Sequence, residues 1–368
     1  MSVAGRQARF RWAVVVAGTA LLCAVPAIVA AWPVSASVLS AAQLRAAVLA
    51  SGHVPYDGYA ESDVDLSLPM LPDLHNVIAL LDGTTDQYVW YRSPGQWRAD
   101  VLTSAGEDDL YQVGQRTYDW NYASNLLTQV VGNQPVRLPR AADLLPPSLA
   151  RRLVNFAGRG AQAERLPSQR VAGISAAGLR LAETDPRSTI GAVDIWADPR
   201  TGLPVQVEIF GRGSATPTLV SRFLGLSFRR PSVGVVTPDP GPGAGQTTTS
   251  LPAVSGVLNG FGPQLPGRLG GFAQVPTPGG LADVGAYGSG FARFAVVPLP
   301  GRDGQTVLTA ASSAGATVQI AGGTAELVSV PLLTMLLVRS PAGPVYLLVG
   351  TVTAAALEQA ASSLVTGQ

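Results

Sequence analysis

The sequence predicts an α+β protein with an N-terminal transmembrane helix, a larger domain built on an antiparallel sheet, and a smaller α+β domain. Three observations predict this: an uncharged apolar segment after a basic N-terminus, a long series of strand-like runs, and a Pro/Gly-rich break before a second series. With 368 residues the chain is about two domains long. We divide it into residues 1–35 (cytoplasmic tip and anchor, or signal peptide), 38–230 (first domain), 231–264 (linker) and 265–368 (second domain).

The membrane segment, residues 13–31, reads AVVVAGTALLCAVPAIVAA and holds no charge. It is close to the roughly 20 apolar residues that cross a bilayer core. Arg6, Arg9 and Arg11 precede it, so we expect a cytoplasmic N-terminus and an exported remainder. With Trp32 at the interface, we expect residues 13–32 to form a single-pass anchor in the cell membrane, with both domains extracytoplasmic.

A cleaved signal peptide is the alternative to an anchor, and it would make the protein secreted. Small residues around Val34-Ser35-Ala36 offer a cleavage site. The length of the apolar segment favours the anchor. Acylation of Cys23 is disfavoured because Leu22 stands where a lipoprotein signal needs a small residue.

The first domain begins with a short amphipathic helix, Val38–Leu49, after which the hydrophobic period changes towards two. Turn signals separate the runs that follow, which predicts a meandering antiparallel sheet. The predicted strands are His53–Leu68, Asn76–Leu81, Gln87–Arg92, Gln96–Thr103, Asp109–Val113, Arg116–Tyr122 and Leu126–Val131.

One helix, Ala141–Gly158, interrupts the sheet, with Pro146-Pro147 in its first turn, where proline is tolerated. Its apolar stripe must pack on the sheet. Strands resume at Arg170–Ala182, Ala192–Ala197, Pro204–Gly211 and Thr218–Arg229. Gly202 supplies the positive φ that lets the hairpin 194–208 return.

The stretch PDPGPGAGQTTTS near residues 238–250 cannot bury a core and is typical of a linker, which would let the two domains reorient. The second domain is predicted to contain five strands and a closing helix. These are Phe291–Pro298, Thr317–Ile320, Ala325–Val330, Leu333–Arg339, Val345–Gly350 and the helix Ala354–Leu364.

Composition excludes several classes of function. The 25 basic residues are all Arg and face 24 acidic residues, for a net charge of +1, so we expect no nucleic-acid partner. The absence of Lys excludes a P-loop and Schiff-base chemistry. One Cys and two His make neither a disulfide framework nor a Cys/His zinc site. We therefore expect no cofactor and no metal.

No catalytic set is recognisable, and we expect the protein not to be an enzyme. His53 and His75 are the only imidazole bases, and neither has a Ser or Cys nucleophile in a known context. The acidic run Glu107-Asp108-Asp109 is a set that can bind a cation, but we interpret it as a solvated turn.

The aromatic strands have two interpretations. They are core packed under the 141–158 helix, or they form a concave face that the helix covers to leave an apolar cavity for acyl chains. A sheet has two faces, so both can hold. The candidate cavity residues are Trp90, Trp97, Leu102, Tyr118 and Trp120, with the lid residues Leu149, Leu153 and Phe156.

The order of these elements resembles the lipoprotein-carrier (LolA/LolB-like) superfamily. The entry Tyr56-Asp57-Gly58-Tyr59, the meander, the inserted Pro-containing helix and the hairpin from Trp196 to Pro204 carry the resemblance. It implies an unclosed antiparallel β-barrel of about eleven strands with a helical lid and an apolar cavity.

The second domain is similar to the small C-terminal α+β domain of RseB/MucB proteins. The resemblance lies in Ala286–Val296, in the strand from Tyr346 to Val352 and in the helix after it. RseB proteins are extracytoplasmic regulators that hold a membrane anti-sigma factor and are thought to sense lipid-like ligands. They are usually soluble with a cleaved signal, whereas this chain has an expected anchor, so their partner is not carried over.

The sequence thus predicts a non-enzymatic, membrane-anchored regulator. Its first domain binds a lipid or acylated ligand, and its second contacts a membrane protein, either anti-sigma-like or a transporter. The alternatives are a lipid or lipoprotein carrier or chaperone, and an accessory subunit of a membrane transporter. A carrier should exchange cargo between membranes, whereas a regulator need only bind.

Overall fold

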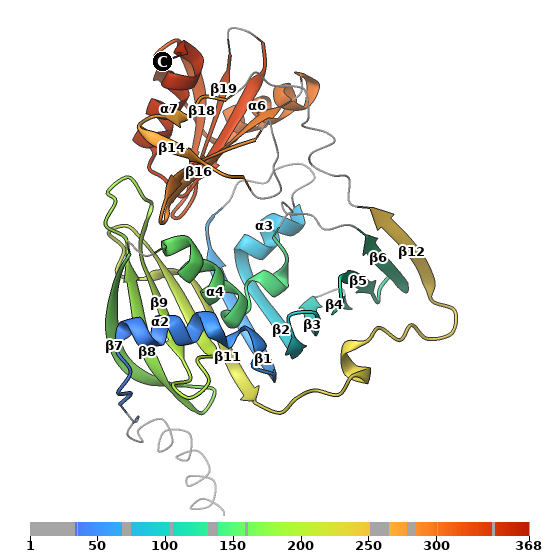
Figure 1. The fold of residues 1–368 in the computed structure, drawn as a ribbon. Helices are drawn as coiled ribbons and strands as arrows, with labels where there is room; N and C mark the ends of the chain where they lie inside the picture. Colours follow the sequence, from blue (N-terminus) through green and yellow to red (C-terminus); the bar gives the residue numbers. More distant parts are fainter. Residues whose placement is uncertain are drawn as a thin grey trace, which may run out of the picture.

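The computed structural model describes residues 34, 36–67, 75–103, 106–131, 139–158, 161–250, 265–277, 284–299, 301–340 and 343–367. These residues form two unclosed sheets, one built from strands between residues 56 and 250 and one from strands between residues 268 and 350 (Figure 1). The predicted membrane segment 13–31 lies outside the described residues. Within them, no helix has the length and apolar character needed to span a membrane.

The first sheet has twelve strands in the order β12-β6-β5-β4-β3-β2-β1-β11-β10-β9-β8-β7, with its two ends unpaired to each other. The strands β1 to β11 pair with one another antiparallel, which matches the open barrel of about eleven strands that the resemblance implied. Their bounds are β1 Tyr56–Asp65, β2 Asp82–Ser93, β3 Gln96–Thr103, β4 Gly106–Val113, β5 Arg116–Asn121, β6 Leu126–Val131, β7 Gln162–Val171, β8 Ile174–Ala182, β9 Ile190–Ala197, β10 Pro204–Gly211 and β11 Pro217–Ser227.

Helices lie on the concave face of this curved sheet, which we call the inner face (Figure 1). They are α2 (Ala41–Ala50) with the 3₁₀ turn η1 (Ser51–His53), and η2 (Ala141–Asp143) followed by α4 (Pro146–Ala157). Ser40 caps α2 in a capping box with Gln43. Side chains of α2 and α4 share a core with the inner side of β8 to β10, including Leu44, Leu179, Ile195 and Val207.

Two predicted strands are wrong. Asn76–Leu81 belongs to the helix α3 (His75–Leu81), since a short apolar run does not by itself distinguish a buried strand from a helix. The predicted strand Arg170–Ala182 contains the β7–β8 turn, where Ala172 and Gly173 have φ values of 46° and 79°. The positive φ predicted for Gly202 is confirmed at 73°.

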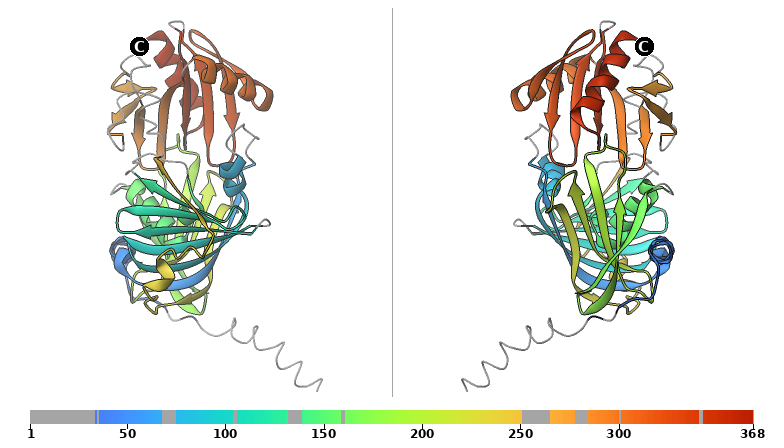
Figure 2. Two further views of the ribbon diagram at one scale, coloured as in Figure 1. Left: turned by 90° about the vertical axis from the view of Figure 1, so that its right-hand side faces the viewer. Right: turned by 90° about the vertical axis from the view of Figure 1, so that its left-hand side faces the viewer.

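Part of the predicted linker is built into the sheet. We call residues 231–250 the strap. The Arg92 guanidinium donates to the carbonyl oxygen of Pro231, Val236 in the turn η3 (Gly234–Val236) is fully buried, and β12 (Gly245–Ser250) pairs in parallel with β6. The left view of Figure 2 shows the strap crossing the outside of β2 to β6. A run of Thr has no apolar side chains to bury, but its backbone N–H and C=O groups can still pair with a neighbouring strand at the edge of the sheet.

The second sheet has eight strands in the order β13-β14-β15-β16-β20-β19-β18-β17, between two helices. Alternate residues of β19 and β20 face opposite sides: Leu336 and Leu348 lie in the core with α7, whereas Leu337 and Val345 lie in the core with α6. The bounds are β13 Arg268–Leu269, β14 Phe272–Val275, β15 Gly285–Ser289, β16 Ala292–Leu299, α6 Gly301–Ala314, β17 Ala316–Ile320, β18 Gly323–Ser329, β19 Thr334–Arg339, β20 Val345–Gly350 and α7 Ala354–Thr366.

The sequence did not predict α6 or the strands β13 to β15. The α6 segment GRDGQTVLTAASSA is rich in Gly, Ser and Thr, which are poor helix formers. Its helical state comes from tertiary packing of Val307, Leu308 and Ala311 on the sheet.

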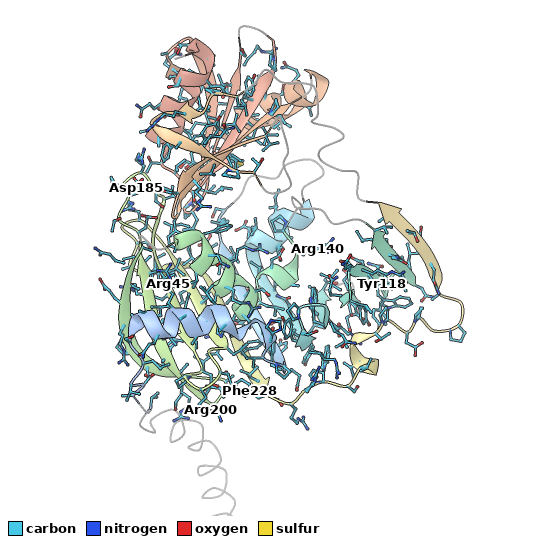
Figure 3. The ribbon with its side chains drawn as sticks, viewed as in Figure 1. Arg45, Tyr118, Arg140, Asp185, Arg200 and Phe228 are labelled. Carbon is cyan, nitrogen blue, oxygen red and sulfur yellow. The ribbon has the colours of Figure 1, made fainter. Side chains whose placement is uncertain are left out.

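A loop joining β8 to β9 connects the two domains. The backbone N–H of Thr189 donates to the carbonyl oxygen of Thr351 at 3.1 Å, and the N–H of Thr353 donates to the carbonyl oxygen of Arg187 at 2.8 Å. Phe291 and Leu332 of the second domain are buried in the core of the first. Figure 3 shows Asp185 of this loop at the junction. The domains are docked through backbone pairing and shared apolar packing, in contrast to the loose linkage expected from the sequence.

Candidate functional site

A cavity of about 840 Å³ lies on the inner face of β2 to β6, beside η2 and the start of α4. This volume is in the range of roughly 300–1,000 Å³ that is usual for small-molecule sites. The described residues that line it are Tyr56, Val89, Tyr91, Pro94, Trp97, Leu110, Gln112, Gln115, Arg116, Thr117, Val130, Val131, Arg140, Ala142, Asp143, Leu145, Ser148 and Arg151.

The strand wall of the cavity follows from the sheet register. Tyr91 pairs with Trp97, Trp97 with Gln112, and Gln112 with Thr117, so these side chains share one face of four strands. Tyr56 pairs with Tyr91, and their rings stack at 5.1 Å between centroids. The wall therefore combines aromatic rings with the polar side chains of Gln112 and Thr117.

The other wall comes from η2 and α4. The carbonyl of Leu144 accepts the hydroxyls of Ser62 and Ser221 at 3.4 and 2.5 Å, which fixes this segment to β1 and β11. Leu145 and Ser148 then face the cavity, together with Arg151. Figure 3 shows Arg140 between α4 and strands β4 to β6.

Positive charge gathers at the cavity. Arg151 donates to the Ser51 hydroxyl at 3.3 Å. Burial raises the pKa of Tyr91, and the charge of Arg151 opposes that shift. The lining carboxylate, Asp143, has its two oxygens engaged by the Arg152 guanidinium at 2.8 Å and the Arg140 backbone N–H at 2.9 Å. Within the described residues, Arg116 and Arg151 make no ion pair.

The opposite, outer face of β3 and β4 carries an acidic cluster around Arg98. The Arg98 guanidinium lies 2.5 Å from Asp100, 2.8 Å from Asp109 and 3.3 Å from Glu107. It also lies over the rings of Trp90 and Tyr111 at 5.1 and 5.2 Å. The run 107–109 is therefore not a solvated turn: it is part of β4, and the Asp109 side chain is fully buried.

Burial shifts the titration of this cluster. It raises the pKa of Asp109 to about 8, with the nearby Asp100 adding to the shift and Arg98 opposing it. Burial likewise raises the pKa of Asp100 to about 6, against the stabilising Arg98. Oxygens of Asp100, Glu107 and Asp109 lie within 4.8 Å of one another, but Arg98 already supplies the positive charge among them.

Of the eight candidate cavity residues, Trp97 lines the cavity. Trp90, Leu102, Tyr118 and Trp120 lie on the outer face, in register with Arg98, Glu107, Tyr111 and Asp109 respectively. There Trp120 packs with Tyr111 and Leu127, with Tyr118 and Ala244 of the strap against them.

The three lid residues divide between two environments. Leu149 and Leu153 lie in the core that α4 forms with the sheet. Phe156 is 43% exposed, and the Arg293 guanidinium of the second domain lies 5.5 Å from its ring centroid. The structure thus places Phe156 at the domain junction rather than beside the cavity.

Sequence reasoning missed Tyr56, Tyr91, Leu145 and the three arginines of the cavity. A signal for Tyr91 was present: residues equidistant from the Ser93-Pro94-Gly95 turn face the same side, so Trp97 shares its face with Tyr91 and not with Trp90. The arginines come from β5, the loop before η2 and α4, and no local pattern joins them.

No family model matches the chain, and no curated protein matches it. Among solved structures it is similar to MucB in "The complex structure of Pseudomonas aeruginosa MucA/MucB" at 16% identity, over 87% of this chain and 96% of that chain, with a TM-score of 0.49. A second MucB complex, with MucA(peri), gives 16% identity over 87% and 97% and a TM-score of 0.48. A LolA superfamily protein from Nitrosomonas europaea gives 14% identity over 55% and 99% and a TM-score of 0.26. These solved structures come from the two groups of proteins that the sequence resembles, MucB and the LolA superfamily.

Proposed function

We propose that this chain is an extracytoplasmic, non-enzymatic regulator that binds a lipid or acyl-bearing ligand in its first domain. The cavity of about 840 Å³, with a wall that includes the apolar side chains of Tyr91, Trp97 and Leu145, carries the proposal. Such a wall favours an apolar chain because burial of apolar surface is worth roughly 25 cal/mol per Å². The basic residues before segment 13–31 support anchoring in the cell membrane with both domains outside.

The α4 helix provides a route from ligand to partner. Leu145 directly before it and Ser148 and Arg151 in its first turns line the cavity, and near its end Phe156 lies under Arg293 of the second domain. A ligand that favours a displaced α4 also changes this contact, and a partner that binds the second domain then responds to the ligand. The partner in this proposal is a membrane protein, anti-sigma-like or a transporter.

The contact between α4 and the second domain favours a regulator over a carrier. A carrier needs only the cavity, and its cargo moves from donor to acceptor vesicles without a partner. A regulator retains its ligand in that assay and changes its affinity for a partner on binding.

A cavity-filling variant tests the proposal. The full chain, purified in amphipol and delipidated, is titrated with a fluorescent fatty acid. Ala142→Phe adds volume to the cavity lining, and we expect it to abolish saturable binding. The matched control Ala244→Phe adds the same volume on the outer face and should leave binding unchanged. Equal binding by a folded Ala142→Phe protein would remove the cavity from the function.

A further inference from the structure

A second cavity, of about 470 Å³, lies at the junction between the two domains. Its lining includes Thr189 and Arg212 of the first domain and Thr334, Thr353 and Ala354 of the second. It shares no residue with the first-domain cavity. No Asp or Glu is among the described residues that line it, so hydrogen-bond donors are not matched by a carboxylate there.

The helix α7 begins at this junction cavity. The first N–H groups of a helix have no carbonyl partner within it, and they carry the positive end of the helix dipole. Ala354 is the first residue of α7, and its N–H donates to none of the described residues. Thr353 before it makes no side-chain capping bond. The start of α7 therefore offers donors to whatever occupies the cavity.

The Thr334 hydroxyl points independently to a ligand. Thr334 is fully buried, and its Oγ1 has no hydrogen-bond partner among the described residues. Leu336 and Val338 of the same strand pack in the core with α7, so by alternation the Thr334 side chain also faces the side of the sheet that α7 covers. A buried hydroxyl without a partner is unfavourable, and an acceptor in the cavity removes that cost.

Arg212 adds a positive charge from the first domain. Its Nε donates to the carbonyl oxygen of Ser188 at 2.7 Å and its Nη2 to that of Asp185 at 2.6 Å, which fixes the guanidinium against the β8–β9 loop. Within the part of the chain that the structure describes, Arg212 makes no ion pair and its Nη1 makes no hydrogen bond. Guanidinium groups bind carboxylate and phosphate oxygens strongly.

We infer that the junction cavity binds a small oxyanion, held by Arg212 of the first domain and by the start of α7 and the Thr334 hydroxyl of the second. Phosphate and carboxylate share this chemistry, because both present charged oxygens to N–H and O–H donors. A cation finds no carboxylate among the described lining residues. Since the donors come from both domains, the bound anion stabilises their docked arrangement. This site does not depend on lipid binding by the first domain.

Isothermal titration calorimetry of the full chain in amphipol tests the inference. The probes are inorganic phosphate, glycerol 3-phosphate and succinate, each added at constant ionic strength against sodium chloride. We expect saturable binding of at least one probe and a Tm that rises with its concentration. The two phosphates against succinate distinguish a phosphate ligand from a carboxylate. Absence of saturable binding by all three probes overturns the inference.

A proline variant removes one donor without changing the helix. Ala354→Pro deletes only the N–H, because proline is favoured at the first position of a helix and Thr353 already has the extended φ of −63° and ψ of 155° that proline requires before it. The affinity for the anion should fall about tenfold. The matched control Ala41→Pro makes the same change at the start of α2, after the equally extended Ser40, and should leave the affinity unchanged.

Two side-chain variants test the other donors. Thr334→Val replaces the hydroxyl with a methyl group of the same shape and should also weaken binding about tenfold. Arg212→Gln removes the charge and should weaken binding most. Thr334→Val and Ala354→Pro keep the test decisive if Arg212→Gln loosens the β8–β9 loop. Unchanged affinity in these two variants, or an equal loss in Ala41→Pro, overturns the inference.

Discussion

Side chains alternate between the two faces of the strands β2 to β5, and the two faces differ in their chemistry. The inner row, Tyr91, Trp97, Gln112 and Thr117, lines the cavity. The outer row, Trp90, Arg98, Tyr111 and Tyr118, holds one guanidinium within an acidic cluster. The comparison shows that an aromatic-rich strand does not identify a binding face until its pairing is known.

The largest effect is expected from Arg98→Ala on the outer face. It removes the guanidinium group that the buried Asp100 and Asp109 side chains share, and breaking such a buried pair costs about 3–5 kcal/mol. Urea unfolding at neutral pH measures the loss. The matched variant Arg222→Ala breaks an exposed pair with Glu61 and should cost no more than about 1 kcal/mol. Equal losses would show that the cluster is no more buried in solution than the surface pair.

Leu153→Ala compares the inner face with the outer. Leu153 is 7% exposed in the core under α4, so truncation should cost about 2–3 kcal/mol. Leu102→Ala removes the same atoms from an outer position that is 40% exposed and should cost about 0.5 kcal/mol or less. Chemical denaturation of both variants checks the difference, and a similar cost at the two sites would contradict the assigned faces.

The acidic cluster should make the protein less stable as the pH rises. The pKa values of Asp109 and Asp100 are raised to about 8 and about 6, so the folded state binds protons that the unfolded state releases. Their contribution to the stability of the folded state is fully present below the unfolded-state pKa of about 3.9. It is lost as the pH rises towards the folded-state pKa of Asp109.

Asp109→Asn tests this titration because an amide resembles the protonated carboxyl. The Tm of the variant should fall less than that of the unchanged protein between about pH 5 and about pH 8. Other buried acids, such as Glu208, remain in both proteins and cancel in the difference. Parallel Tm curves would show that Asp109 does not titrate in this range.

The smallest effect is expected at the domain junction, in Arg187→Ala. The Arg187 guanidinium lies 3.8 Å from the Phe272 ring centroid, and an exposed contact of this kind contributes about 0.5–1 kcal/mol. Limited proteolysis of the β8–β9 loop and the Tm report the change. Phe291→Ala removes a buried side chain of the same junction and should lower the Tm and expose the loop more than Arg187→Ala does. A larger effect from Arg187→Ala than from Phe291→Ala would contradict this order.

Much of the fold could be predicted from the sequence. The period-two runs gave most strands of both sheets, and the Pro-containing segment gave α4 within a few residues. The helices α3 and α6 could not be predicted, because α3 is a short apolar run and α6 is rich in weak helix formers that packing holds in place. The pairing of the strap with the sheet could not be predicted either, because its polar strand β12 contributes backbone hydrogen bonds and has no apolar pattern.

The candidate site was predicted less well than the fold. An inner cavity and a covering helix were expected, but Trp97 is the candidate that the structure places in its lining. The other aromatic candidates were chosen by residue type across strands, and the hairpin turns assign them to the outer face. Phe156 continues the helical stripe of Leu149 and Leu153, but it lies beside the second domain. The helical period gives no information about a contact with another domain.

The sequence by itself determined the elements with local causes: strand alternation, turns that need Gly202, the cap of α2 and the uncharged N-terminal segment. Only the tertiary structure decided which face of β2 to β5 becomes a cavity and which holds the cluster around Arg98. It also decided that side chains from β5, from the loop before η2 and from α4 line the same cavity. The physical reason is that local patterns report backbone preference and burial over a few residues, whereas a binding site is formed by side chains that strand register and helix docking bring together across the chain.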